Sequence, residues 1–213
     1  VRADIRFADV TDELGLRPGK GRAAWADLDG DGWTDLVAGG RIWRNREGGR
    51  FEDVTAEAGL ARHAGPCVIG DFDGDGTNDL YLADQMGALY LGRGAFRFEK
   101  GRADTNAFVV QAAAAADFDQ DGWIDLYLAN YEIWDQNIDF PDLALRNHRG
   151  ALRLQWTAPP GKQMRARGVT CCDFNRDGRI DLHVSNYRLM PNFLWLNRGG
   201  WDWEDVARAY GCA

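Results

Sequence analysis

The fold is decided by one nine-residue stretch, Asp27-Leu28-Asp29-Gly30-Asp31-Gly32-Trp33-Thr34-Asp35, which recurs three times along the 213-residue chain. The later copies occupy residues 71–79, 117–125 and 173–181. Each copy places an oxygen-bearing side chain at positions 1, 3, 5 and 9 and a glycine at position 6. Ca²⁺ binds roughly six to eight oxygen ligands, and glycine lets the backbone of such a loop turn sharply. The pattern therefore predicts up to four calcium-binding loops.

The predicted calcium ligands are the side chains at these four positions and the backbone carbonyl at position 7. The side-chain ligands are Asp27, Asp29, Asp31, Asp35, Asp71, Asp73, Asp75, Asp79, Asp117, Asp119, Asp121, Asp125, Asp173, Asn175, Asp177 and Asp181. The carbonyl ligands belong to Trp33, Thr77, Trp123 and Arg179. An ordinary solvated turn would explain one Asp-rich copy, but four copies with the same offsets favour metal binding. The fourth site is expected to be the weakest, because Asn175 replaces a carboxylate and Arg176 adds positive charge.

These loops are not EF-hands. An EF-hand loop ends with a glutamate ligand at about position 12 and lies between two helices. Position 12 is here occupied by Ala38, Leu82, Leu128 and Val184. The residues after each loop are short runs rich in branched and aromatic side chains, such as Asp79-Leu80-Tyr81-Leu82, and such runs are typical of strands. Each loop is therefore predicted to join one strand to the next.

The acidity of the chain belongs to the loops. The net charge is −8, and 15 of the 33 acidic residues occupy ligand positions, so the acidic residues left over are fewer than the 25 Lys and Arg. No basic cluster is dense enough to indicate nucleic-acid binding, and no apolar run is long enough to span a membrane. The start at Val1 fits a processed chain or a fragment. Cys67, Cys171, Cys172 and Cys212 show no metal-binding spacing, and their disulfide state stays open.

The loops begin 44, 46 and 56 residues apart, a period that suits a four-stranded propeller blade. A strand of small residues precedes each loop (Ala23–Ala26 is the first), a second strand follows it, and a third (Ile42–Asn45) and an aromatic fourth (Phe51–Val54) complete the unit. The approximate repeats are residues 7–50, 51–95, 96–150 and 151–200, with the start of a fifth at 201–213. The predicted fold is all-β: a propeller of four-stranded blades in one domain, or a segment of a larger propeller.

The fourth-strand pattern occurs once more than the loop does. Phe7–Val10 and Trp203–Val206 both carry it, so five copies accompany four loops. Each blade needs one fourth strand, so we expect a longer propeller or a second chain that completes the ring. The alternative is a four-bladed ring with one spare strand packed outside.

Three motifs together carry a family resemblance. The D-x-D-x-D-G-x-x-D loops, the D-L-Y-L strand and the F-x-D-V-T-x-x-A-G-L link at residues 51–60 resemble the FG-GAP/VCBS repeat family over nearly the whole chain. Its relatives include the integrin α-subunit propeller and ASPIC-type secreted proteins of bacteria. The resemblance implies calcium bound at the loop aspartates and a location outside the cytoplasm. The fourth loop departs from the pattern at Asn175 and Arg176.

No catalytic arrangement involves His63, His148 or His183, so the chain is not expected to be an enzyme. The favoured function is a calcium-binding scaffold for protein–protein interaction or assembly. One alternative is a lectin-like or polysaccharide lyase-like protein, for which glycan is the partner. Another is a purely structural subunit of a larger complex.

A non-repeating segment, residues 131–142, lengthens the third repeat between its second and third strands. Loops of this kind concentrate binding residues, and aromatic side chains are favoured at interface centres. The candidate partner contacts are Tyr131, Trp134, Ile138 and Phe140. The alternative is that the segment folds onto its own blade.

Overall fold

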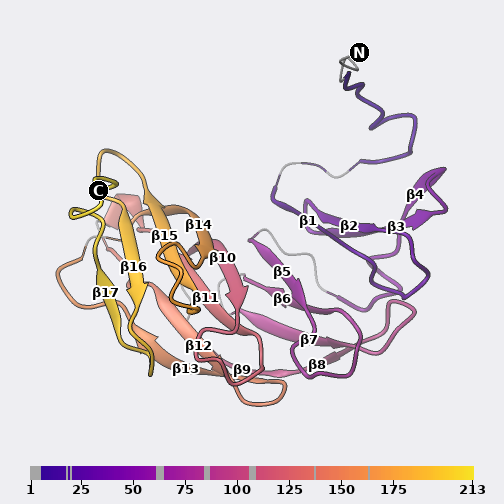
Figure 1. Ribbon diagram of the computed structural model, residues 1–213. Helices are drawn as coiled ribbons and strands as arrows, with labels where there is room; N and C mark the ends of the chain where they lie inside the picture. The colour runs from indigo at the N-terminus through magenta and orange to yellow at the C-terminus, as the bar shows by residue number, and fades with distance from the viewer. Residues whose placement is uncertain are drawn as a thin grey trace, which may run out of the picture.

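Figure 1 shows the computed structural model, which describes residues 6–17, 19, 21–60, 65–83, 87–105, 109–136, 138–162 and 164–213. In these residues the regular elements are β-strands, apart from one turn of 3-10 helix, η1 (Trp134–Gln136). The predicted all-β class is confirmed. Among the described residues, no helix has the length and apolar character needed to cross a membrane.

The strands form four sheets, and each sheet contains the four consecutive strands of one repeat in chain order. The first comprises β1 (Ala23–Ala26), β2 (Asp35–Ala38), β3 (Arg41–Arg46) and β4 (Arg50–Asp53). The second comprises β5 (Cys67–Gly70), β6 (Asp79–Leu82), β7 (Ala88–Gly92) and β8 (Phe98–Lys100). The third comprises β10 (Val110–Ala116), β11 (Asp125–Asn130), β12 (Leu143–Asn147) and β13 (Ala151–Thr157). The fourth comprises β14 (Ala166–Cys172), β15 (Asp181–Asn186), β16 (Phe193–Asn197) and β17 (Trp203–Asp205).

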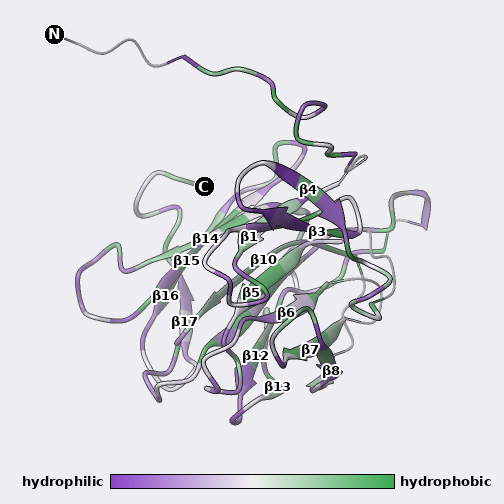
Figure 2. Ribbon diagram, turned by 90° about the vertical axis from the view of Figure 1, so that its right-hand side faces the viewer, coloured by the Kyte–Doolittle hydropathy of each residue, from purple (hydrophilic) through white to green (hydrophobic). Residues whose placement is uncertain are grey.

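Neighbouring sheets meet along their first strands. β1 contacts β5, β5 contacts β10, and β10 contacts β14, so the four sheets follow one another in chain order (Figure 1). The small side chains of these strands, as in the alanines of β10, allow this close approach. Figure 2 shows the resulting contrast between the hydrophobic β10 and the hydrophilic outer strand β4.

The core consists of apolar layers between adjacent sheets. Leu28, Val37 and Ile42 of the first repeat pack with Leu80 and Leu82 of the second. Equivalent layers join the second sheet to the third and the third to the fourth. In the first three sheets every residue of the second strand is buried, including all six residues of β11. In the fourth sheet the fully buried strand is the third, β16. A repeat therefore completes its core only against its neighbour.

Two features differ from the sequence prediction. A three-residue strand, β9 (Arg102–Asp104), pairs in parallel with β13 and adds a fifth strand to the third sheet. Phe7–Val10 does not form the predicted fourth strand, and Phe7 is 96% exposed. A fourth strand needs a third strand beside it, and every third strand in the described residues already pairs with the fourth strand of its own sheet.

The link that should follow this strand nevertheless forms. The N–H of Leu14 donates to the carbonyl of Val10 at 3.0 Å, as the N–H of Ala58 donates to the carbonyl of Val54 at 2.9 Å. The four cysteines are free thiols.

Candidate metal centre

The loop fold begins with the aspartate at position 1. Its Oδ2 accepts the N–H of the position-6 glycine at 2.8–2.9 Å in all four loops: Asp27 from Gly32, Asp71 from Gly76, Asp117 from Gly122 and Asp173 from Gly178. The four glycines have φ between 86° and 89°, a region that strains any side chain. The first aspartate and the glycine thus fix the curvature of the loop without the help of a bound ligand.

The aspartate at position 9 connects the loop to its sheet. Asp125 is buried, and its two oxygens accept the N–H groups of Phe118 at 2.9 Å and of Asn147 at 2.8 Å. Asp35, Asp79 and Asp181 accept the equivalent pairs of N–H groups in the other loops. One side chain therefore ties the start of the loop to the second and third strands.

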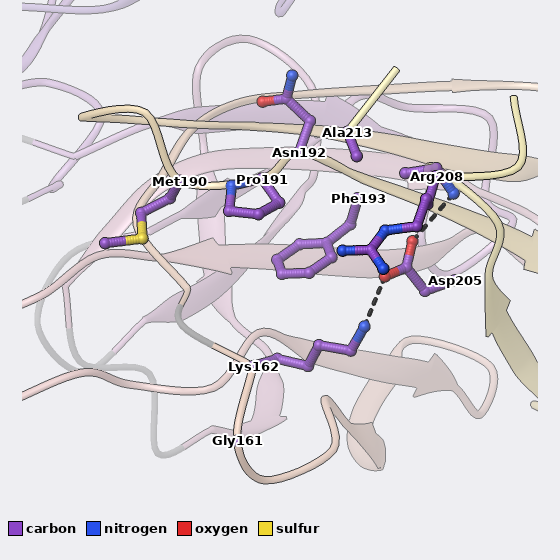
Figure 3. A pocket seen from close by; sticks show the side chains of 10 residues that line it. Gly161, Lys162, Met190, Pro191, Asn192, Phe193, Asp205, Arg208 and Ala213 are labelled. Atoms are coloured by element: carbon purple, nitrogen blue, oxygen red, sulfur yellow. Dashed lines mark hydrogen bonds and ion pairs between the residues drawn. The ribbon is translucent and has the colours of Figure 1, made fainter. Parts of the chain in front are cut away.

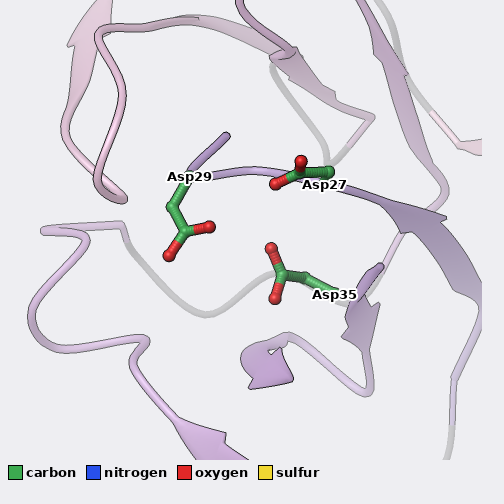
Figure 4. Close-up of side chains that lie close together, drawn as sticks. All are labelled: Asp27, Asp29 and Asp35. Carbon is green, nitrogen blue, oxygen red and sulfur yellow. The ribbon is translucent and has the colours of Figure 1, made fainter. Parts of the chain in front are cut away.

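Positions 1, 3 and 9 come together in the first three loops. One carboxylate oxygen from each residue lies within 4.8 Å of the others in three triads: Asp27, Asp29 and Asp35; Asp71, Asp73 and Asp79; and Asp117, Asp119 and Asp125. Figure 4 shows the carboxylates of the first triad turned toward a common space. Three carboxylates held this close repel one another unless a cation or a proton lies between them. The donor set is entirely oxygen, so the triads fit a hard metal ion.

Position 5 lies outside these triads and faces an arginine instead. Arg44 pairs with Asp29 at 2.6 Å and with Asp31 at 3.2 Å in the first loop. Arg93 bridges the equivalent aspartates of the second loop and Arg146 those of the third. Each arginine therefore pairs with the aspartate at position 5 and with the position-3 member of the triad, and the aspartates at positions 1 and 9 have no basic partner among the described residues.

The fourth loop has no acidic triad because Asn175 stands at position 3. The Asn175 amide donates to Asp177 at 2.9 Å, and Arg179 pairs with the same carboxylate at 2.5 Å. Asp173 and Asp181 keep the hydrogen bonds of the other loops. The weaker fourth site, position 5 as a ligand and the four carbonyl ligands at Trp33, Thr77, Trp123 and Arg179 stay predictions.

Burial gives the aspartates of one loop different pKa values. It raises the pKa of Asp79 to about 6 and that of Asp125 to about 7. The hydrogen bond from the Thr77 hydroxyl instead lowers the pKa of Asp75. In the absence of metal, protons compete for the innermost carboxylates while the outer ones stay ionised.

Asparagine side chains join each loop to the next repeat. The amide of Asn78 donates to the carbonyl of Asp27 at 2.7 Å. Asn147 donates to Phe72 of the second loop, and Asn197 donates to Phe118 of the third, both at 2.8 Å. The loops therefore form a connected row at one end of the sheets.

One cavity lies away from the loops. It has a volume of about 520 Å³ and is lined by Lys162, Phe193, Asp205 and Arg208, among others (Figure 3). The Lys162 ammonium pairs with Asp205 at 2.6 Å and lies 5.2 Å from the centroid of the Phe193 ring. His148 lines a smaller hollow beside the third loop, His183 lies in β15, and His63 falls outside the described residues.

The segment of candidate partner contacts folds back on itself. Ile133 and Ile138 form a β-bridge, and Ile138 is 42% exposed. Tyr131 and Phe140 are half-buried, whereas Trp134 lies in η1 and its side chain is outside the description. Glu132 is buried and pairs with Arg165 at 3.1 Å, so one part of the segment packs against the fourth repeat.

Comparisons with known proteins address the family. The family model described as an FG-GAP-like repeat matches residues 27–82 and 71–128. A search of curated proteins gave no match. Among solved structures, the chain is similar to the crystal structure of the V. cholerae biofilm matrix protein Bap1, with 18% identity, a TM-score of 0.46 and 76% of this chain covered. The match spans 23% of the length of that protein.

Proposed function

Because this chain carries FG-GAP-like repeats, we propose that it is a calcium-binding β-propeller scaffold that mediates protein–protein interaction or assembly outside the cytoplasm. The observation that carries the proposal is the set of three carboxylate triads, repeated at the same place in successive sheets. A hard cation is the simplest group that neutralises such triads.

The propeller part rests on the sheet arrangement. Four sheets with the same strand order follow one another, with their first strands side by side. This order supports a propeller or a segment of one, in which the sheets are blades. The exposed Phe7 and its intact link favour the segment, since its strand pattern has no sheet to join within the described residues.

Calcium is preferred to magnesium on chemical grounds. Ca²⁺ accepts several carboxylates in flexible geometry, whereas Mg²⁺ demands near-octahedral geometry and retains waters. Extracellular calcium modules bind with Kd of about 10⁻⁴–10⁻³ M. At a free concentration about ten times Kd, each site adds about 1.4 kcal/mol to stability. Three or four filled sites would then contribute about 4–6 kcal/mol, which is comparable with the net stability of a domain.

Thermal unfolding in calcium and in EGTA tests the proposal. Calcium should raise Tm, magnesium at the same concentration should raise it less, and native mass spectrometry should report three or four bound ions. Asp73→Asn removes one triad carboxylate and should lower the ion count by one. Asp104→Asn removes an exposed carboxylate outside the loops and should leave the count unchanged. An identical Tm in calcium and EGTA would refute calcium as a structural ligand.

The interaction part rests on the non-repeating segment. Ile138 is exposed in a stretch that the repeat does not require, and Tyr131 lies at its base. We assign the partner contact to the exposed side of this segment, while its Glu132 side secures it to the fourth repeat. Exchange of Ile138 for Asn tests this assignment, because it should weaken co-purification of partner chains without changing Tm.

A further inference from the structure

Two tyrosines lie at the far ends of the third and fourth sheets, opposite the ends that carry the aspartate loops. Tyr131 follows β11 and Tyr187 follows β15. Both are held by the same frame: the preceding asparagine, Asn130 or Asn186, donates its amide at 2.7 Å to the carbonyl of a proline in the following connection. The backbone N–H of each tyrosine donates at 2.9 Å to the residue before the neighbouring first strand. The backbone at both tyrosines is therefore fixed in the same way, so the two side chains start from equivalent places in neighbouring sheets.

An arginine is directed between these rings by a β-bulge. In β14, Ala166 pairs with Asn186 and Gly168 pairs with Ser185, so Arg167 is the extra residue of the strand. Bulges bend a strand and re-aim a side chain, and they are frequent beside functional sites. β10 has a bulge at the same place, where Gln111 accepts a hydrogen bond from Arg22.

The Arg167 guanidinium is clamped by aromatic faces. Its central carbon lies 4.3 Å from the ring centroid of Tyr131 and 4.6 Å from that of Tyr187, and the two centroids are 6.4 Å apart. Both distances are well within the range of a cation–π contact. Arg167 is exposed and makes no ion pair with any residue that the structure describes. The two rings hold the guanidinium in place, and its exposure leaves it accessible to a group from outside the chain.

The surroundings of the clamp supply more positive charge and apolar surface. Arg188 lies 5.4 Å from the Tyr187 ring. Arg188 and Leu189 both have φ of 58°, a left-handed conformation that is unfavourable for such residues. This turn leaves Leu189 fully exposed. The nearby carboxylate of Glu132 is committed to Arg165. The site therefore combines an arginine that lacks an acidic partner with an exposed apolar side chain.

We propose that the Arg167 clamp, formed with Tyr131 and Tyr187, binds a carboxylate side chain of a partner protein that has an apolar residue beside it. This inference rests on the proposed scaffold function and names the chemistry of its partner. A guanidinium edge binds carboxylates in a bidentate manner, and Tyr and Arg dominate interface hot spots. An acidic peptide fits better than a sugar, because Arg167 already occupies one face of each tyrosine, on which a sugar would otherwise stack.

The test uses immobilised eight-residue peptides, each with one Asp or Glu between apolar residues, beside copies that carry Asn or Gln. The full chain is applied in constant calcium, and binding to the best peptide is measured by fluorescence anisotropy. Wild type should prefer the acidic copy, and Arg167→Gln should weaken that binding by about tenfold or more. Arg167→Lys keeps the charge but loses the planar fork and should also bind less tightly. Arg153→Gln makes the same charge change at an exposed site on β13 and should bind like wild type.

Several outcomes would overturn the clamp proposal. These are no preference for acidic peptides, a preference that survives in Arg167→Gln, or an equal loss in Arg153→Gln. Binding of polygalacturonate instead of peptides, abolished by Arg167→Gln, would replace the protein partner with an acidic polysaccharide. Calcium-dependent Tm is recorded on the same variants. If calcium still raises Tm but no acidic peptide binds, the clamp proposal is wrong and the proposed calcium-binding scaffold stands. If acidic peptides bind through Arg167 but calcium does not change Tm, the clamp proposal stands and calcium binding is wrong.

Discussion

Replacement of Asp125 by alanine should destabilise the protein even when no metal is bound. The Asp125 carboxylate accepts the N–H groups of Phe118 and Asn147, and all of these groups are buried. Alanine leaves both N–H groups without an acceptor, and each buried donor left unpaired costs about 1–3 kcal/mol. The expected loss is therefore about 2–6 kcal/mol. Urea unfolding in EGTA, followed by tryptophan fluorescence, should show the midpoint fall by about 1–3 M.

The neighbouring Asp121 provides the matched control. It is exposed, accepts the N–H of Trp123 and pairs with Arg146. Asp121→Ala removes the same charge from the same loop. Its free energy of unfolding in EGTA should stay within about 0.5 kcal/mol of that of wild type. Asp125→Asn keeps one oxygen acceptor and should lie between wild type and Asp125→Ala. If Asp125→Ala and Asp121→Ala shift the midpoint equally, the position-9 aspartate acts through charge and not through its two hydrogen bonds.

Three further predictions concern other carboxylates. Burial raises the pKa of Asp142 to about 7 from 3.8, so the folded state holds this proton more tightly and stability falls as pH rises from about 4 to 7; Asp142→Asn should flatten that part of a urea-midpoint profile, and an unchanged slope would contradict this. Calorimetric calcium titration should show that Asp75→Ala removes a tighter class of site than Asp177→Ala does, and the opposite order would disprove the weak fourth site. Glu132→Gln leaves the buried Arg165 without its closest carboxylate and should cost about 3 kcal/mol by urea unfolding; a change below about 0.5 kcal/mol would show that the pair is not structural.

Most of the strand framework could be predicted because the repeat states it four times. The first strand at Ala23–Ala26 has the predicted bounds. Each loop turns tightly at its glycine and is tied to the sheet by its buried ninth residue, so the strands on either side of it must run antiparallel. The failures lie where a segment depends on a partner distant in the chain. Phe7–Val10 has the residues of a fourth strand but no third strand to join, and β9 is a strand because β13 presents a free edge to it.

The arginines that pair with the aspartate loops could not be found from sequence spacing, because they come from different places in the repeat. Arg44 and Arg146 lie in third strands, Arg93 follows a third strand, and Arg179 lies inside its loop. What the four arginines share is that each guanidinium pairs with the aspartate at position 5 of its loop. A periodic pattern in the sequence cannot express such a pairing.

The asparagines that join neighbouring repeats also make one contact from different places in the sequence. An asparagine stands at the end of the third strand in the third and fourth repeats and one residue before the end in the first, but the second repeat has Gly92 at the end of this strand and Asn78 in its loop. A side chain at Gly92 would lie 2.3 Å from the Asn78 carbonyl oxygen, so the two positions exchange roles. The sequence shows the two residues, and the structure shows that they serve one contact.

The same asparagine contacts turn the four loops into a one-dimensional array with nearest-neighbour coupling. An event in one loop would act on the next through these few contacts, to which Gln120 of the third loop adds a hydrogen bond to Gly178 of the fourth, and it would reach a distant loop only through the loops between. An interior loop thus has two neighbours and a terminal loop has one, so under the proposed calcium binding chemically similar loops would differ in affinity according to their place in the row. If the loops bind calcium as proposed, we expect ion uptake by the linked loops to differ from uptake by independent sites, and Asn147→Ala to weaken the link between the second and third loops.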